Sequence, residues 1–479
     1  MQTPPPHART GLWLLCILAF ALALRLYHVT EPAWDYHNWR QTITLMVARD
    51  FAREGFPLWH PQVAWLGRGP SDPSYFSAEF SIQSVLAALL YRTFGESETL
   101  ARLVVIAFSL LGIACLYDML ERRTGPLAAR TGAFLYALLP YHVFFGRVFM
   151  PDVPAISLAL AGLDALDRWT GKRKLSWLCA AGVLTALAIL QKLTVLFALV
   201  PAAYLLFLVE GRRILRRPEP YVFAALAAIP PLIWYAHVVA MAPISVFAMD
   251  RGLFGHRLDL WVHGTFIVSV LKALSQEAFS PAGVALVLLG LLYPTRGRAI
   301  WTFRCWFLAA ALLLFLMPGV LPSNHYYLSL LLPGGAGMAG IALAGLLHRR
   351  PGLLAAVLAI FAVAAIGSAV PLYEPDRLPH DLGVRLRSMT APDDLIVTET
   401  GGSPNVLYYA DRRGWLLFRE FDPARVENLR RSGAAWYADA FPRDPQEHPD
   451  FFRALNERYR RVAEDSPWRI YRLSASPTN

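Results

Sequence analysis

The sequence predicts a polytopic α-helical membrane protein that carries a small soluble α/β domain at its C-terminal end. Its 479 residues are 56% hydrophobic and only 17% charged, whereas soluble domains carry roughly 25% charged residues. Apolar stretches long enough to cross a bilayer recur through the first 370 positions, and the polar tail after them contains none. Composition therefore excludes a disordered chain and an ordinary soluble enzyme.

About eleven stretches are candidate transmembrane helices. In lipid every backbone polar group must form a hydrogen bond within the protein, which a helix achieves, and a helix of about 20 apolar residues is long enough to cross the bilayer. The first could be mistaken for a signal peptide. It lacks a clear small-residue cleavage site and many spans follow it, so we expect it to be retained. The candidates lie near residues 11–28, 100–120, 126–145, 151–168, 175–191, 193–209, 220–240, 278–293, 300–317, 326–347 and 352–370.

The distribution of charge predicts the orientation. Residues 371–479 hold 16 arginines and 17 acidic residues, a net of −1, which leaves 29 basic and 18 acidic residues, a net of +11, in the first 370. Basic loops face the cytoplasm, so an odd number of spans places the N-terminus inside and the tail outside. The loops that carry this charge are Glu121–Arg123, Gly171–Lys174, Gly211–Arg217, Arg296–Arg298 and His348–Arg350.

The predicted outer face carries two long loops and the tail. The first loop, about 29–99, contains half-apolar segments that suit amphipathic helices at the membrane interface, and the second covers about 241–277. We expect a membrane domain over 1–370 and an α/β domain over 371–479. In the tail the pattern predicts strands at Asp394–Thr398 and Leu416–Phe418, helices at Pro423–Ala438 and Phe451–Arg461, and a helix cap at Asp422.

Several function classes lose support. The basic excess belongs to the membrane part, which disfavours nucleic-acid binding. The four cysteines lie in apolar stretches and form no CxxC pair, so neither a disulfide framework nor a cysteine metal site is expected. Gly335–Gly340 satisfies GxGxxG, but no strand precedes it, and its small-residue spacing favours helix packing. GxxxxGK[ST], HExxH and GxSxG motifs are absent, which argues against ATP-driven transport and zinc or serine hydrolysis.

Ionisable residues at the outer mouths of the spans are the candidate functional residues, because charge near the bilayer is costly. Asp35, His37 and Arg40 lie within Trp34–Gln41, a run that suits either a polar-substrate site or an interfacial aromatic belt with an ion pair. Asp152, after Arg147, opens the fourth span. It is either functional or a carboxylate favoured by the helix dipole, and Glu79 has the same two interpretations.

Two further candidates lie among apolar residues. Lys192 separates two apolar runs in which nothing else is charged. It either extends its ammonium group to the interface or contacts an anion. His325 and Tyr326 open the tenth span on the predicted outer side, where tyrosine is also common as an interfacial anchor.

Taken together, these positions resemble the GT-C superfamily of polytopic glycosyltransferases that use polyprenyl-phosphate sugars. The family 39-like members, which include protein O-mannosyltransferases and the aminoarabinose transferase of lipid A, are the most similar. The resemblance covers about 25–350, and the strings Asp35–Thr42 and Tyr409–Trp415 look like bacterial members. Glu79-Phe80 stands where the aminoarabinose transferase has Lys-Pro, and Asn38 where it has Arg. The matching elements follow in the family's order: Asp35, amphipathic helices ending near Phe94-Gly95, Leu100-Ala101-Arg102, Pro151-Asp152 and Gln191-Lys192.

The resemblance implies a multi-pass enzyme of the bacterial inner membrane. It would be an inverting glycosyltransferase that moves a sugar from a polyprenyl-phosphate donor to an acceptor hydroxyl of a glycan, lipid or protein on the periplasmic face. Asp35 would be the general base. The expected donor-binding residues are Arg40, Lys192, Tyr326 and His325, and the expected acceptor-binding or supporting residues are Asp152, Arg147, Glu79 and His37. No metal or other cofactor is expected to be required, although a divalent ion is compatible with the pattern.

Two other classes stay open at this point. One is a multi-span transporter or a flippase of lipid-linked sugars, and the other is a non-catalytic scaffold of cell-envelope assembly. The sequence shows no inverted repeat and no paired broken helices, which transporters often have. Its polar candidates also gather at one face and not at the membrane midplane, where a transporter places its site.

Overall fold

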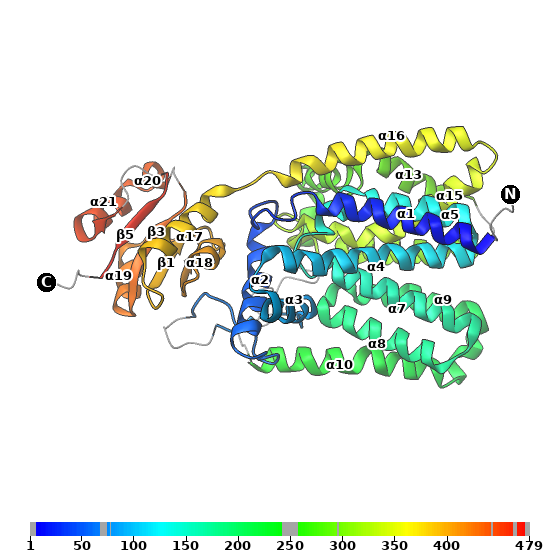
Figure 1. Ribbon diagram of the computed structural model, residues 1–479, viewed down its shortest axis with the longest axis horizontal. Coiled ribbons are helices and arrows are strands. Elements are labelled where there is room, and N and C mark those ends of the chain that lie inside the picture. The colour runs from blue at the N-terminus through cyan, green and yellow to red at the C-terminus, as the bar shows by residue number, and fades with distance from the viewer. Residues whose placement is uncertain are drawn as a thin grey trace. The chain divides into compact units, whose positions relative to one another are not determined.

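The computed structural model describes residues 6–67, 74–76, 78–241, 257–294, 297–441, 444–462 and 467–474. The chain forms two compact units, which we name the helical unit and the α/β unit (Figure 1). The helical unit comprises Met1–Thr30, Ser77–Ala87 and Thr99–Tyr373. The α/β unit comprises Glu31–Phe76, Ala88–Glu98 and Glu374–Asn479. Most of the first predicted outer loop therefore belongs to the same unit as the tail, in contrast to the division at residue 370. Part of the second predicted outer loop, 242–256, and Arg296 of one basic loop lie outside the described residues.

Each predicted apolar run of the helical unit coincides with one helix or with two helices joined by a short break. The elements are α1 (Pro6–Leu26), α3 (Ile82–Phe94, shared with the α/β unit), α4 (Glu98–Thr124), α5 (Pro126–Leu138), α6 (Pro140–Phe145), α7 (Asp152–Lys172), α8 (Leu175–Gln191), η1 (Leu193–Ala198), α9 (Leu199–Glu210), η2 (Gly211–Arg216), α10 (Glu219–Met241), η3 (Leu258–Val262), α12 (Gly264–Lys272), η4 (Ala273–Ala278), α13 (Ser280–Leu292), α14 (Ala299–Leu316), η5 (Pro318–Val320), η6 (His325–Leu331), α15 (Leu332–Leu347), α16 (Pro351–Ala369) and η7 (Val370–Tyr373).

Several of these helices are long and apolar enough to cross a membrane. Within the described ranges there are five, or six when the pair Gly264–Ala278 and Ser280–Leu292, which turns by 100°, counts as one span. Other apolar runs are interrupted. Pro140, for example, separates α5 from α6, because proline cannot donate the helical hydrogen bond at its position. The structure therefore supports a multi-span protein, while the number of about eleven spans stays a prediction.

Helices α5 and α15 cross at two glycines. A Cβ atom at Gly340 would lie 2.4 Å from Cα and 2.5 Å from the nitrogen of Gly132. At the same crossing the Thr131 hydroxyl donates a hydrogen bond to the Gly340 carbonyl at 3.0 Å. Small residues allow this close approach of two backbones in lipid. The string Gly335–Gly340 lies inside α15 and packs helices, as its small-residue spacing predicts.

The α/β unit is built on a mixed sheet of order β2-β1-β3-β5-β4. Strands β2, β1 and β3 are parallel, β5 is antiparallel to β3, and β4 is antiparallel to β5. Its core includes Val397, Trp415, Tyr437 and Leu455, which are all buried. The elements are α2 (Asn38–Arg53), α17 (Arg377–Met389), β1 (Leu395–Glu399), α18 (Asn405–Ala410), β2 (Gly414–Leu417), α19 (Pro423–Arg431), β3 (Ala434–Asp439), α20 (Asp444–Glu447), α21 (Pro449–Arg458), β4 (Arg460–Arg461) and β5 (Arg469–Arg472).

The first predicted outer loop completes this unit. Thr42 of α2 donates to Asn405 of α18 at 2.7 Å. Arg53 pairs with Asp411 at 2.9 Å and with Glu96 at 2.6 Å. Residues 64–66 run beside β2: the Leu66 amide donates to the Gly414 carbonyl at 2.7 Å, and the Gly414 amide donates to Ala64 at 3.1 Å. Helix α2 and the segment after it are thus held by the tail, although more than 300 residues separate them in sequence.

Two helices of the tail were predicted too long. The helix expected at Phe451–Arg461 ends at Arg458, and Arg460–Arg461 form the strand β4. Residues 423–438 were expected to form one helix, but α19 ends at Arg431 and Ala434–Asp439 is the strand β3. The chain turns at Gly433, whose φ is +104°, a conformation that glycine adopts without strain. The predicted cap is present, since the Asp422 carboxylate accepts the Ala424 amide at 2.8 Å. The strands predicted near 394–398 and 416–418 coincide with β1 and β2.

We predict that Gly340→Ala destabilises the protein by about 1–3 kcal/mol, because the added methyl group meets the backbone of α5. Gly367→Ala on α16 is the matched control, since a Cβ there meets no atom within 4 Å and alanine favours the helix by up to about 1 kcal/mol. Thermal unfolding of the purified proteins in detergent measures both changes. Equal loss of stability in the two variants would contradict the close crossing.

A second prediction concerns pH. Burial raises the pKa of Asp50 on α2 to about 6, and its carboxylate accepts the Gln62 amide at 3.1 Å. A raised pKa favours the neutral form, so the contribution of Asp50 to stability is fully present below about pH 4 and is lost as the pH rises through about 6. Asp50→Asn keeps an acceptor for Gln62 and does not titrate.

The melting temperature of Asp50→Asn should therefore rise relative to the wild type as the pH increases from 4 to 7. We expect a relative gain of roughly 2–4 °C, which corresponds to about 1 kcal/mol after allowance for partial solvent screening. Paired melting curves at several pH values measure it. A constant difference between the two proteins across this range would rule out a raised pKa at Asp50.

Candidate functional site

Lys192 occupies a break between two helices of the helical unit. It follows the last residue of α8, Gln191, and precedes the first residue of η1, and its backbone is extended with φ −160° and ψ 116°. The break releases Lys192 from both helices, and its side chain is 7% exposed. Lys192 therefore lies inside the protein and not on its surface.

The ammonium group of Lys192 pairs with Asp152 and lies over two aromatic rings. Lys192 Nζ is 2.5 Å from Asp152 Oδ1. It is also 4.6 Å from the ring centre of Tyr326 and 4.3 Å from that of Tyr327. Asp152 is 1% exposed, and its Oδ2 has no hydrogen-bond partner within the described ranges. A charged pair and an aromatic cage together hold a buried cation in one place. We name Asp152, Lys192, Tyr326 and Tyr327 the lysine cluster.

The segment that contains Glu79 is bound to the end of α8 next to this cluster. The Phe80 amide donates to the Leu190 carbonyl at 2.9 Å, and the Ile82 amide donates to Gln191 Oε1 at 2.8 Å. Gln191 also bonds Gln83. Glu79 itself is buried. The structure therefore places Glu79 beside the chain break that presents Lys192.

His325, next to Tyr326 of the lysine cluster, contacts Glu277, a residue that the sequence analysis did not single out. His325 Nδ1 is 3.9 Å from Glu277 Oε2, and the Tyr141 hydroxyl donates to the same oxygen at 2.6 Å. Glu277 lies in the π-helical turn η4, just before Ser280, whose φ is +64°. Both features are frequent at functional sites. An acid at the mouth of a span was the available signal, but Glu277 was assigned to the end of a loop.

Arg147 lies apart from the lysine cluster. Its guanidinium donates to the His28 carbonyl at 3.3 Å and lies over the rings of Phe144 and Tyr373. Asp152, which follows Arg147 by five positions in sequence, bonds Lys192. Arg147 is fully buried, and these contacts tie the end of α6 to the end of α1.

Asp35, His37 and Arg40 belong to the α/β unit. Asp35 is buried, and its Oδ1 accepts a hydrogen bond from Gln41 Nε2 at 2.6 Å. Arg40 is also buried, with its guanidinium 5.3 Å from the ring centre of Phe76. His37 has a left-handed backbone with φ +57° and precedes α2. Gln41, one turn into α2, was not singled out from the sequence, yet it orients the Asp35 carboxylate.

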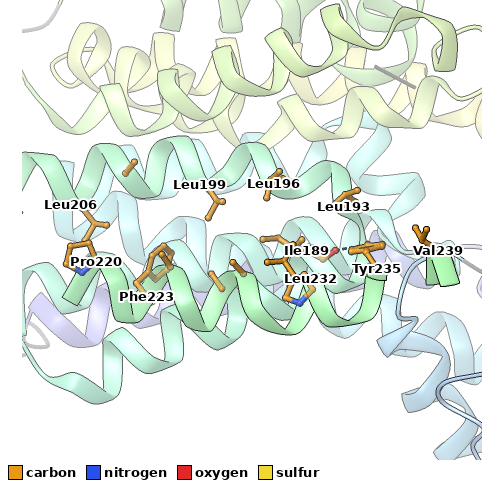
Figure 2. Close-up of a pocket in the computed structure, with 15 residues that line it drawn as sticks. Ile189, Leu193, Leu196, Leu199, Leu206, Pro220, Phe223, Leu232, Tyr235 and Val239 are labelled. Atoms are coloured by element: carbon orange, nitrogen blue, oxygen red, sulfur yellow. Dashed lines mark hydrogen bonds between the residues drawn. The ribbon is translucent and has the colours of Figure 1, made fainter. Parts of the chain in front are cut away.

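An apolar groove of about 560 Å³ follows the lysine cluster along α8, α9 and α10 (Figure 2). Figure 2 shows Ile189, Leu193 and Tyr235 at one end and Leu206 and Pro220 at the other. Lys192 lies in sequence between the lining residues Ile189 and Leu193. The Tyr235 hydroxyl donates to the Ile189 carbonyl at 3.0 Å. Because the walls are otherwise apolar, the groove suits a long hydrocarbon chain.

The part of the chain that the structure describes contains no group of three or more His, Cys, Asp or Glu side chains able to hold a metal ion.

The candidate residues form two sets, with Arg147 outside both. Asp152, Lys192 and Tyr326 are in direct contact, with Glu79 and His325 beside them. Asp35, Arg40 and His37 lie in the other unit, and Arg147 has separate partners.

Comparison with known proteins identifies similar folds. Residues 82–234 match the model of the family described as dolichyl-phosphate-mannose-protein mannosyltransferase. No curated protein matches the sequence. The crystal structure of ArnT from Cupriavidus metallidurans bound to undecaprenyl phosphate is 16% identical, with a TM-score of 0.70 over 97% of this chain and 98% of that chain.

Two structures from Archaeoglobus fulgidus are also similar. An oligosaccharyltransferase in complex with zinc and sulfate is 14% identical, with a TM-score of 0.62 over 92% of this chain and 69% of that chain. AglB in complex with an inhibitory peptide and a dolichol-phosphate is 13% identical, with a TM-score of 0.60 over 98% and 75%. These similarities confirm the resemblance to GT-C glycosyltransferases, and the chain has the fold of these membrane enzymes.

Proposed function

We propose that the protein is an inverting glycosyltransferase that moves a sugar from a polyprenyl-phosphate donor to an acceptor hydroxyl on the periplasmic face of the membrane. The observation that carries this proposal is the lysine cluster at the end of an apolar groove. A buried cation next to an apolar groove suits a ligand with an anionic headgroup and a long apolar tail. Two of the similar structures contain ligands of this chemistry, undecaprenyl phosphate in one and a dolichol-phosphate in the other.

In the proposed donor complex, Lys192 contacts the phosphate and the groove holds the first isoprene units. Burial of apolar area is worth about 25 cal/mol per Å², so the tail supplies affinity and the headgroup supplies position. The phosphate becomes the leaving group, and Lys192 stabilises the negative charge that develops on it. His325 and Tyr326 follow each other at the start of η6 and are proposed as further donor contacts, as is Arg40.

Asp35 is the proposed general base. The acceptor oxygen attacks the anomeric carbon from the face opposite the phosphate, the carbon–oxygen bond to the phosphate breaks with its electron pair, and the acceptor proton passes to the Asp35 carboxylate. Inversion follows from this single displacement. The hydrogen bond from Gln41 supports the role because it fixes one carboxylate oxygen. Asp152, Arg147, Glu79 and His37 are proposed as acceptor-binding or supporting residues.

The proposed transfer needs no metal, because cationic side chains meet the charge of the leaving phosphate. Incubation of the purified protein with labelled polyprenyl-phosphate sugars, with acceptor extracts and with EDTA, tests the function and this expectation together. Sugar transfer or slow donor hydrolysis that survives EDTA supports the proposal. Movement of intact lipid-linked sugar across vesicles without transfer would indicate a flippase, and neither activity would favour a scaffold.

The role of Asp35 leads to a prediction. Asp35→Asn should lower the transfer rate about 10²–10⁴-fold, the usual contribution of a general base, while binding of the polyprenyl-phosphate donor is retained. The asparagine oxygen can still accept the Gln41 hydrogen bond, so we expect normal folding. Asp393→Asn, an exposed position of the same unit, is the control and should transfer at the wild-type rate. Wild-type turnover in Asp35→Asn would remove the base assignment.

The lysine cluster leads to another prediction. Lys192→Met alone leaves the Asp152 carboxylate buried without its cation and should cost about 3–5 kcal/mol of stability. The double variant Lys192→Met/Asp152→Asn buries no charge, so it should recover much of that stability. It should nevertheless bind polyprenyl phosphate at least about tenfold more weakly, because a hydrogen bond between charged groups is lost.

Asp152→Asn is the matched control for this measurement. It keeps the lysine cation and an acceptor oxygen at position 152, so its affinity for polyprenyl phosphate should equal or exceed that of the wild type. Lipid titration monitored by native mass spectrometry compares the proteins. Wild-type affinity in a folded double variant would exclude Lys192 from the phosphate contact.

A further inference from the structure

A second recess lies at the other end of α9, away from the lysine cluster. It has a volume of about 470 Å³ and is lined by Tyr204, Phe207, Leu208, Gly211, Arg298 and Trp301. The Tyr204 hydroxyl donates to the Arg298 carbonyl at 2.9 Å, which joins α9 to the start of α14. None of these six residues lines the apolar groove along α8, α9 and α10. This recess, which we name the arginine recess, is therefore distinct from the proposed donor site.

The arginines at this end of the helical unit fall into two groups. The first group is neutralised inside the protein. Arg122 Nη2 is 2.6 Å from Asp164 and 2.7 Å from Asp167, and Arg168 Nε is 3.0 Å from Asp164. Arg123 bonds Asp167 at 2.5 Å, and both Arg122 and Arg168 contact Asp118. Three arginines thus meet three aspartates within one closed network.

The second group consists of one arginine in the wall of the arginine recess and three in the short helix that follows Gly211. Arg298 lines the recess, and Arg212, Arg213 and Arg216 follow Gly211 on η2. All four side chains are exposed. No ion pair joins any of them to an acidic side chain that the structure describes. Exposed arginines close together in the chain attract anions from the surroundings.

The walls of the recess indicate what kind of anion fits. Trp301 is 44% exposed and Phe207 is 53% exposed, so large apolar surfaces stand beside the arginines. Tryptophan and tyrosine with basic residues are typical of the level at which lipid headgroups meet hydrocarbon. A soluble anion would make no contact with the apolar wall, and a neutral lipid would make no ion pair with the arginines.

We propose that the arginine recess binds an anionic phospholipid. Its phosphate lies against Arg298, and an acyl chain follows Phe207 and Leu208 along α9. Basic recesses between membrane helices at the cytoplasmic face bind such headgroups in this way, and Gly211–Arg217 and Arg296–Arg298 are two of the basic loops that predict this face. The proposal does not depend on the glycosyltransferase function.

The test compares two lipids with identical acyl chains. Delipidated, full-length protein in detergent is given equal amounts of phosphatidylglycerol and phosphatidylcholine, and native mass spectrometry measures which lipid is retained. The wild type should retain phosphatidylglycerol in preference. Arg298→Gln should lower the preference about fivefold, the factor that about 1 kcal/mol per arginine near the headgroups represents, and Arg298→Lys should largely keep it.

Lys174→Gln is the matched control, because it removes one exposed charge from another basic loop and leaves the recess intact. It should keep the wild-type preference. Trp301→Leu should lower retention of both lipids, since it removes the apolar wall. Equal retention of the two lipids by the wild type would overturn the proposal. An equal loss of preference in Arg298→Gln and Lys174→Gln would overturn it too, because it would show attraction to overall charge and not to this recess.

Discussion

The helical unit depends on one buried ion pair, between Lys192 and Asp152. An isolated charge in a low-dielectric interior is costly, and an opposite charge at hydrogen-bond distance offsets much of that cost. Lys192 stands where α8 ends and Asp152 where α7 begins, so the pair fixes two helix ends against each other. Tyr326 and Tyr327 complete the shell around the ammonium group from η6. Three separate regions of the chain are thus held by a single cation.

Helix breaks make this arrangement possible. A break in a membrane helix exposes backbone groups that must find other partners. At the Pro140 break between α5 and α6, the buried Arg25 supplies them: it donates to the Ala137 carbonyl at 3.3 Å and the His142 carbonyl at 2.9 Å. Its Nε also donates to Ser109 at 2.6 Å. Because helix ends and breaks leave backbone groups that need polar partners, the polar candidate residues lie at helix ends and not along helix faces.

Local patterns in the sequence predict most of the elements but not their partners. Hydropathy and loop charge indicate the helices, and the ionisable residues at the ends of the apolar runs include Asp152 and Lys192. The contact between these two residues is not visible, because 40 positions separate them and no periodicity relates them. Glu277 was missed for a related reason: a π-helical turn has no composition signal of its own. In the tail, β3 was read as helix because Ala434, Ala435 and Ala438 favour helix locally, whereas the sheet offers Trp436 and Tyr437 a pleated surface beside β1.

The grouping of the first outer loop with the tail was not predicted either, because it depends on contacts between residues far apart in sequence. Arg53 and Asp411 form an ion pair across 358 positions, and hydropathy carries no information on such a contact. The pairing has a functional consequence under the proposed mechanism. Asp35 precedes α2 by three residues, and α2 is bound to α18 through Thr42 and Asn405. The position of the proposed base is therefore set by the α/β unit. Substitutions in the tail that weaken the packing of α18 would lower the rate of the proposed transfer, although the substituted residues do not contact a substrate.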